Sequence, residues 1–175
     1  MIRKFDFMTA KNGHTSKWTH KKLSLKKVIE YLEDAVELDL TYSEYHDMNH
    51  AEQAKVKSDC RAFLGGYFEG KRSIQTIESR SIIALDIDTK FDGNLPKYLE
   101  DNSPYNFYIY NTMTATKRLQ KYRVLFFLDF DIKAAFYEPL ARRIARDLRI
   151  IDYVDRTCYR KNQLMYAPTW LDGAT

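Results

Sequence analysis

Long apolar runs are absent from this sequence, and so are the features of a secreted protein. No stretch approaches the roughly 20 consecutive apolar residues that a membrane-spanning helix needs. The first seven residues, MIRKFDF, lack the apolar core of a signal peptide. Cysteine is nearly absent: Cys60 and Cys158 lie far apart in no metal-binding spacing, as expected of reduced thiols. The sequence therefore predicts a soluble cytoplasmic protein with no membrane partner.

The chain also lacks internal repeats, low-complexity tracts and linkers, so we expect residues 1–175 to form a single domain. Its composition, 45% hydrophobic and 30% charged, is that of a globular protein. Hydrophobic spacing predicts helices at 24–38, 50–60 and 132–149. Short strands and a turn are predicted at 62–72, and further strands at 81–88, 105–110, 122–130 and 162–167. Strands interspersed with helices favour an α+β or α/β domain.

Charge and aromatic content leave the partner of the protein open. The formal net charge is a modest +4, and 13 Tyr and 10 Phe are interspersed with Lys and Arg. Such side chains together can stack on bases and contact phosphates, but the same composition describes an aromatic core with a basic surface. Four histidines form no paired metal motif and are interpreted as surface residues: His14, His20, His46 and His50.

Two acids close an apolar strand in the segment 81–88, SIIALDID. Because side chains alternate in a strand, Asp86 and Asp88 share one face, where like charges repel unless a cation lies nearby. Two carboxylates on one face suit Mg²⁺ or Mn²⁺, which prefer oxygen ligands, and such sites normally include a third acid. Asp155 is our candidate for that acid, with Asp152 in reserve. The alternative is that the pair only marks the end of a strand.

A second acid pair, Asp129 and Asp131, also follows an apolar strand. Asp131 stands where the following helix needs an N-cap, because a carboxylate there accepts hydrogen bonds from the first backbone N–H groups. We therefore interpret this second pair as structural rather than catalytic.

The segment 111–118, NTMTATKR, follows a predicted strand and carries hydroxyls, an amide and two cations. Together with Lys121 and Arg123 it could hold a triphosphate or backbone phosphates through charge-assisted hydrogen bonds. It could equally be a solvated hairpin loop. Lys71 and Arg72, which follow a glycine-rich stretch, have the same two interpretations.

The order of these motifs resembles the archaeo-eukaryotic primase superfamily, and most of all the primase-polymerase domains of phage, plasmid and mobile-island replication proteins. The resemblance extends from about 63 to 170. The metal-binding motif D-h-D, in which h is apolar, matches Asp86-Ile87-Asp88. The single acid before the last strand matches Asp155, and the stretch 162–168, NQLMYAP, fits that last strand. The arginine of the strand after the polar loop falls on Arg123.

This resemblance implies a fold, a cofactor and a reaction. It implies an α+β domain with a central mixed or antiparallel sheet flanked by helices, and with 63–170 as the catalytic core. The helices predicted at 24–38 and 50–60 make 1–62 a mainly helical N-terminal portion. Two divalent ions, Mg²⁺ or Mn²⁺, would bind at the three acids Asp86, Asp88 and Asp155, where a nucleoside triphosphate adds to a 3′-hydroxyl on a DNA template. Single-stranded DNA and a helicase domain of a longer primase-helicase would be the partners, in a bacterial cytoplasm. The residues expected to contact nucleotide or phosphate are Thr112, Lys117, Arg118, Arg123, Lys71 and Arg72.

The second motif of the superfamily, Ser-x-His, does not match, because this chain reads Asn111-Thr112-Met113. A thioether neither donates a hydrogen bond to a phosphate nor carries positive charge. We therefore expect any DNA primase-type nucleotidyltransferase activity to be weak or absent. The main alternative is a degenerate domain that binds single-stranded DNA or a replication partner without catalysis. A metal-dependent nuclease or nicking enzyme is disfavoured, since no His-x-His pair or suitably placed tyrosine accompanies the acids.

Overall fold

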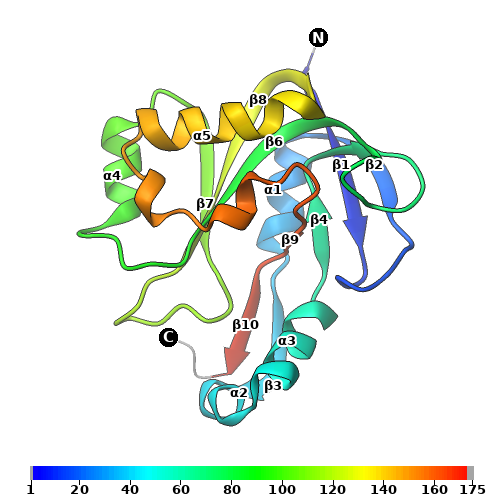
Figure 1. Cartoon of the computed structure of the whole chain (residues 1–175). Helices are drawn as coiled ribbons and strands as arrows, with labels where there is room; N and C mark the ends of the chain where they lie inside the picture. Colours follow the sequence, from blue (N-terminus) through cyan, green and yellow to red (C-terminus); the bar gives the residue numbers. More distant parts are fainter. Residues whose placement is uncertain (1, 173–175) are drawn as a thin grey trace.

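The computed structural model describes residues 2–172, in which two four-stranded antiparallel sheets carry most of the strands (Figure 1). The first sheet has the order β2 (Thr19–Ser24), β1 (Lys4–Ala10), β4 (Ala62–Leu64), β9 (Met165–Tyr166). The second has the order β5 (Gly66–Phe68), β6 (Ile77–Ile87), β8 (Tyr122–Lys133), β7 (Phe107–Asn111). A separate parallel pair joins β3 (Val36–Thr41) to β10 (Thr169–Asp172). The predicted α+β class with antiparallel sheets is confirmed, and the strands divide between two four-stranded sheets and the parallel pair.

Helices cover these sheets, and none of those in residues 2–172 is both long and apolar enough to cross a membrane. The α-helices are α1 (Leu25–Glu33), α2 (Tyr42–Asp47), α3 (His50–Asp59), α4 (Leu95–Asn102) and α5 (Tyr137–Asp147). Short 3-10 helices are η1 (Ala134–Phe136), η2 (Ile151–Tyr153) and η3 (Arg156–Tyr159). The predicted helix at 50–60 is confirmed as α3, and the predicted strands at 81–88, 105–110 and 122–130 are confirmed as β6, β7 and β8.

The N-terminal part differs from its prediction. Helix α1 begins after the N-cap Ser24, as its apolar spacing predicts, but it ends at Glu33 rather than at 38. The following VELDLT alternates apolar and acidic residues with a period of two, and it forms β3 beside β10. Residues 1–62, predicted to be mainly helical, therefore contain the strands β1, β2 and β3 in addition to α1, α2 and α3.

The predicted helix at 132–149 begins later, because β8 continues through Lys133. Helix α5 starts at Tyr137, so Pro139 lies in its first turn, where the missing N–H removes no intrahelical bond. The interpretation of Asp131 as the helix N-cap is wrong. Its carboxylate instead accepts hydrogen bonds from Arg3 Nη2 (2.6 Å) and from the hydroxyl of Ser81, and so ties β8 to the N-terminal residues and β6.

The largest core cluster fixes strand β6, whose last residues are the acids of interest. Most of its buried residues come from β6 and β8 together with α1, α4 and α5, and others come from β1, β4, β7, η3 and β9. Tyr137 of α5 is completely buried and donates a hydrogen bond to the carbonyl of Ala84 (3.3 Å). Buried aromatic rings contribute heavily to core packing, so we expect β6 to be among the most rigid elements of the fold.

Gly65 lies between β4 and β5, where the chain passes close to β6. Its carbonyl accepts hydrogen bonds from the backbone N–H groups of Ser81 (3.0 Å) and Ile82 (3.2 Å). A Cβ added at Gly65 would lie 2.5 Å from Cβ of Ile82, which is far inside van der Waals contact. We expect Gly65→Ala to lower the free energy of unfolding by about 1–3 kcal/mol through this crowding. Urea denaturation followed by circular dichroism measures the free energy of unfolding. An unchanged denaturation midpoint in Gly65→Ala would contradict the close approach of Gly65 to Ile82.

Candidate functional site

Three side chains form a row across the second sheet at its acidic end. Asp86 of β6 lies directly opposite Arg123 of β8, and Arg123 lies directly opposite Tyr110 of β7. Directly opposite residues of an antiparallel pair have their side chains on the same face. Both carboxylate oxygens of Asp86 accept from Arg123: Oδ1 from Nε, and Oδ2 from Nη2 at 2.9 Å. The pair is nearly buried, with 14% of the Asp86 side chain and 9% of the Arg123 side chain exposed.

Arg123 also connects the two sheets. Its Nη1 donates to the hydroxyl of Tyr110 (3.3 Å) and to the backbone carbonyl of Tyr166 in β9, which belongs to the first sheet. The Tyr110 hydroxyl donates to the same carbonyl (2.9 Å). Burial lowers the pKa of Arg123, but Asp86 and Tyr110 together outweigh burial and raise that pKa well above its ordinary value. Arg123 is therefore a permanent cation at the junction of the sheets.

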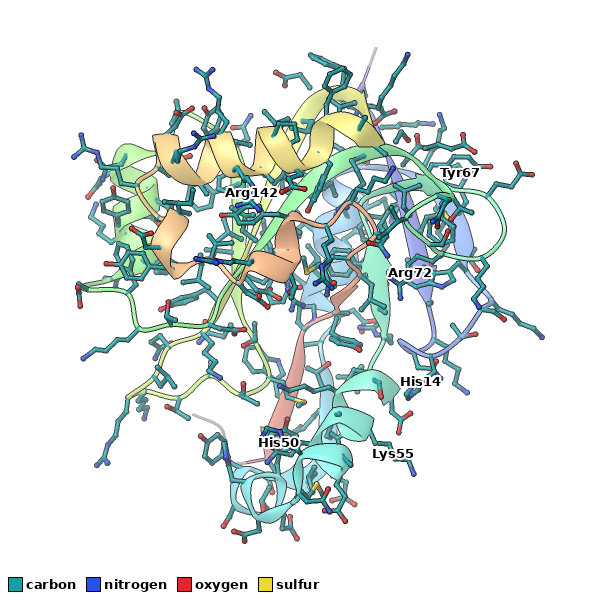
Figure 2. The ribbon with its side chains drawn as sticks, in the orientation of Figure 1. His14, His50, Lys55, Tyr67, Arg72 and Arg142 are labelled. Carbon is teal, nitrogen blue, oxygen red and sulfur yellow. The ribbon has the colours of Figure 1, made fainter. Side chains whose placement is uncertain are left out.

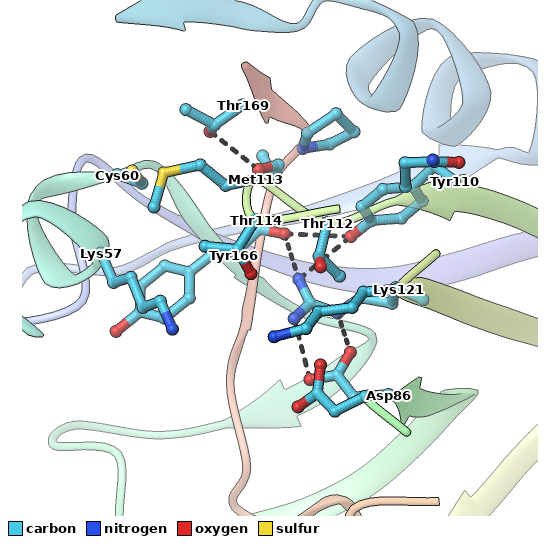
Figure 3. A pocket seen from close by; sticks show the side chains of 15 residues that line it. Lys57, Cys60, Asp86, Tyr110, Thr112, Met113, Thr114, Lys121, Tyr166 and Thr169 are labelled. Carbon is cyan, nitrogen blue, oxygen red and sulfur yellow. Dashed lines mark hydrogen bonds and ion pairs between the residues drawn. The ribbon is translucent and has the colours of Figure 1, made fainter. Parts of the chain in front are cut away.

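A pocket opens over this junction, with a cavity of about 200 Å³ (Figure 3). Its floor is formed by the row just described and its sides by the hairpin loop after β7, the end of α3 and the start of β10. The lining residues are Lys57, Cys60, Asp86, Asp88, Tyr110, Asn111, Thr112, Met113, Thr114, Lys121, Arg123, Tyr166, Ala167, Pro168 and Thr169.

Charge in the pocket is slightly positive. Three cationic side chains, Lys57, Lys121 and Arg123, face two carboxylates, Asp86 and Asp88, which gives a net charge of +1 when all are ionised. Desolvation, and then the negative charge of Asp86, raise the pKa of Asp88. Protonation of that acid makes the pocket more positive still. The electrostatics of the pocket therefore favour an anionic group over an added cation.

The loop after β7 contributes polar and apolar side chains to the same pocket. The hydroxyl of Thr112 is buried and, within residues 2–172, has no hydrogen-bond partner. A buried polar atom without a partner is costly, and a ligand oxygen or N–H would satisfy it. Met113 points toward Cys60 at the opposite wall in Figure 3 and makes that end of the pocket apolar. The segment at 111–118 is thus a hairpin loop whose first residues face the pocket.

The third predicted acid is close in the backbone but not in the pocket. The N–H of Asp155 donates to the carbonyl of Asp86 (2.9 Å), beside the bridge between Ile87 and Val154. The carboxylate of Asp155, however, caps η3 and accepts from the N–H (2.9 Å) and the hydroxyl (2.7 Å) of Thr157.

These contacts do not fit a site for two divalent ions. The carboxylate of Asp86 is held by a guanidinium, that of Asp155 by Thr157, and only Asp88 is exposed. In the described residues, no group of three or more His, Cys, Asp or Glu side chains is placed to hold a metal ion. Asp152, the reserve acid, is exposed in η2.

The remaining predicted phosphate contacts divide into two groups. Lys117 and Arg118 are exposed in the hairpin loop and do not line the pocket. Lys71 is exposed as well, whereas Arg72 is half-buried and donates through Nη1 to the carbonyl of Asn162 (2.5 Å). Figure 2 shows Arg72 near β4 and the segment after η3, away from the labelled residues of α3. Arg72 thus holds the chain before β9, and a role for it at a ligand is untested.

Several pocket residues were not predicted from the sequence. Lys57 comes from α3, Cys60 follows that helix, and Thr169 begins β10. No local pattern marks Lys57 among the many lysines of the chain. Tyr110 carried a signal, because Tyr108 and Tyr110 are two residues apart in β7 and therefore lie on the same face, opposite to Ile109.

Comparisons with known proteins place the chain in a family. The chain belongs to the VapE N-terminal domain family, whose model matches residues 3–174. Among solved structures, it is similar to the AEP domain of the primase-polymerase (PrimPol) of cyanophage S-2L, with a TM-score of 0.45 and 12% sequence identity. That alignment covers 95% of this chain and 74% of the other. No match is found among curated proteins.

Proposed function

We propose that this chain is a primase-polymerase-like domain of a DNA replication protein of a mobile genetic element, and that its pocket binds the phosphates of a nucleoside triphosphate or of single-stranded DNA. The observation that carries the proposal is the convergence of Asp86, Asp88, Thr112 and Arg123 on one pocket, because the sequence motifs single out these residues separately. The net charge of +1 and the unpartnered hydroxyl of Thr112 within residues 2–172 support an anionic, oxygen-rich ligand.

Lys57 and Lys121 are the residues best suited to contact phosphate. Both line the pocket, and within residues 2–172 neither forms an ion pair. Arg123 is less available, because Asp86, Tyr110 and Tyr166 already occupy its donors. The apolar end at Met113 suits a sugar or base rather than a phosphate. A cavity of about 200 Å³ is smaller than the ~300–1,000 Å³ of common ligand pockets, so it encloses one part of a nucleotide.

Binding to single-stranded DNA is expected to be weak and salt-sensitive, since contacts with phosphates release counterions. Lys121→Ala should weaken it and reduce the slope of log affinity against log salt by about 0.7, the value for one phosphate contact on a single strand. Fluorescence anisotropy with a labelled oligonucleotide over a salt series measures both quantities. Lys117→Ala is the matched control, because it removes the same charge from the same loop outside the pocket. Equal effects of the two variants, or binding indifferent to salt, would contradict a phosphate site in this pocket.

The second candidate function is metal-dependent nucleotidyl transfer in the same pocket. The observation that favours it is the backbone contact between Asp155 and Asp86, which brings together the two segments that carry the acids of the family motifs. The resemblance assigns Mg²⁺ or Mn²⁺ to these acids, and a helicase domain in a longer chain of a bacterial host as the partner. An assay of primer synthesis distinguishes the two candidates, and its expected result is argued in the Discussion.

A further inference from the structure

The environment of Arg123 is unusual because its guanidinium has partners on three strands besides its own. Asp86 lies on β6, Tyr110 on β7 and the Tyr166 carbonyl on β9. The pair with Asp86 is bidentate, a geometry that an arginine fork matches and that a lysine does not. A buried arginine with this many partners is a fixed part of the fold rather than a residue waiting for a ligand.

We propose that Arg123 is the permanent counterion of Asp86, at the position where the family resemblance places a divalent metal ion. In this proposal Asp86 is neutralised from within the fold by the bidentate pair. The remaining donor of Arg123, Nη1, links the two four-stranded sheets below the pocket through the carbonyl of Tyr166. The inference concerns the pocket floor alone, so it stands whether or not a nucleotide fills the pocket.

Displacement of Arg123 by a metal ion would be unfavourable. The guanidinium is nearly buried, and without Asp86 it would be a buried charge with only a hydroxyl and a carbonyl as partners. The incoming ion would gain little in return. Asp155 is engaged by Thr157, which leaves the exposed Asp88 as the remaining carboxylate of the pocket, and one carboxylate with water is a weak ligand set.

The two explanations of Asp86 predict opposite effects on folding in the absence of metal. If Asp86 is a metal ligand, its charge is uncompensated in metal-free protein, and Asp86→Asn relieves repulsion with Asp88. If Asp86 is the partner of Arg123, the same substitution leaves a buried cation without its counterion, which is strongly destabilising. Asp88→Asn is the matched control, because it removes the same charge two residues further along the chain, at an exposed position.

The first measurement is urea denaturation of the full chain in EDTA. We expect Asp86→Asn to reduce the folding equilibrium constant by about 100-fold or more. Asp88→Asn should change it by about threefold or less, as exposed charges usually do. Failure of Asp86→Asn to fold, while Asp88→Asn folds normally, is the extreme form of the expected result. Equal stability of Asp86→Asn and the unaltered protein would overturn the proposal.

The second measurement starts from the unaltered protein. Electron paramagnetic resonance of free Mn²⁺ should keep its full signal when the unaltered protein is added at equal millimolar concentration. Arg123→Gln, if folded, should reduce the free signal, because it leaves Asp86 without its ion-pair partner and removes one of the two cations that act on Asp88. Loss of the free signal with the unaltered protein, reversed by Asp86→Asn, would show that Asp86 binds metal and that Arg123 is not its permanent counterion.

Discussion

Primer synthesis by the unaltered domain is expected to be undetectable with Mn²⁺, nucleoside triphosphates and a single-stranded DNA template. Met113 stands where the resemblance to primase-polymerases implies a histidine that contacts phosphate, and a thioether cannot donate a hydrogen bond. The loss of one preorganised donor of this kind typically reduces the rate by about 10²–10³. The cations of the same loop do not replace it, since Lys117 and Arg118 are exposed and lie outside the pocket.

The assay should compare the unaltered domain with Met113→His and with a blank. Met113→His is expected to tighten the binding of nucleoside triphosphate. It is not expected to raise primer synthesis to the same extent, because Asp86 remains paired with Arg123. Asp88→Ala is a better blank than Asp86→Ala, since Asp88 is exposed and its removal leaves the pocket floor intact. Robust synthesis by the unaltered domain that Asp88→Ala abolishes would show that neither the missing histidine nor the paired acid prevents catalysis.

Arg80→Ala should lower the free energy of unfolding by about 3–5 kcal/mol, as large-to-small changes in well-packed cores do. Arg80 is 1% exposed and lies with its guanidinium 3.9 Å from the centre of the Tyr137 ring. It donates to the carbonyls of Gly65 (3.0 Å), Lys161 (2.7 Å) and Ile82 (3.3 Å). Burial lowers its pKa, which reflects the cost of holding a charge there.

Arg80→Met distinguishes the contribution of side-chain volume to stability from the contribution of the buried charge. It keeps much of the side-chain volume and removes the buried cation, so the expected cost falls to about 1–3 kcal/mol, that of the carbonyls left unsatisfied. Arg142→Ala is the matched control, because Arg142 also lies over a tyrosine ring, at 4.1 Å from Tyr159, but 39% of its side chain is exposed. Urea denaturation should place this control within about 1 kcal/mol of the unaltered protein. Equal losses for Arg80→Ala and Arg142→Ala would contradict a special role for the buried arginine.

The elements with a clear hydrophobic period were predictable from the sequence, and the strands without one were not. Strand β2, THKKLS, is an exposed edge strand with adjacent lysines, so it offers no alternation to recognise. Strand β3 did carry a signal, since Val36 alternates with acids in VELDLT, but the same valine also extends the helical spacing of α1. When one residue fits both periods, local pattern alone does not decide between them.

The sequence predicted several residues of the candidate site, but it did not predict that Asp86 and Arg123 form an ion pair. The sequence identifies Asp86, Asp88 and Arg123 as notable, and it indicates that two acids on one strand face need a cation nearby. It does not give the register of β6 against β8, and a shift of one residue would move Arg123 to the other face. Lys57 and Thr169 could not be predicted, because α3 and β10 reach the pocket only through the tertiary fold.

The group formed by α2, α3, β3 and β10 lies at one end of the molecule (Figure 1), and we expect it to open independently of the two larger sheets. Helix α3 buries none of its residues, whereas β6 is buried over most of its length. Amide protons of α3 should therefore exchange through local opening at a much lower free energy than those of β6. Because Lys57 belongs to this group while Arg123 belongs to the sheet, a ligand that contacts both would slow exchange in α3 and leave β6 unchanged. Binding of such a ligand would thus couple occupancy of the pocket to the order of α3.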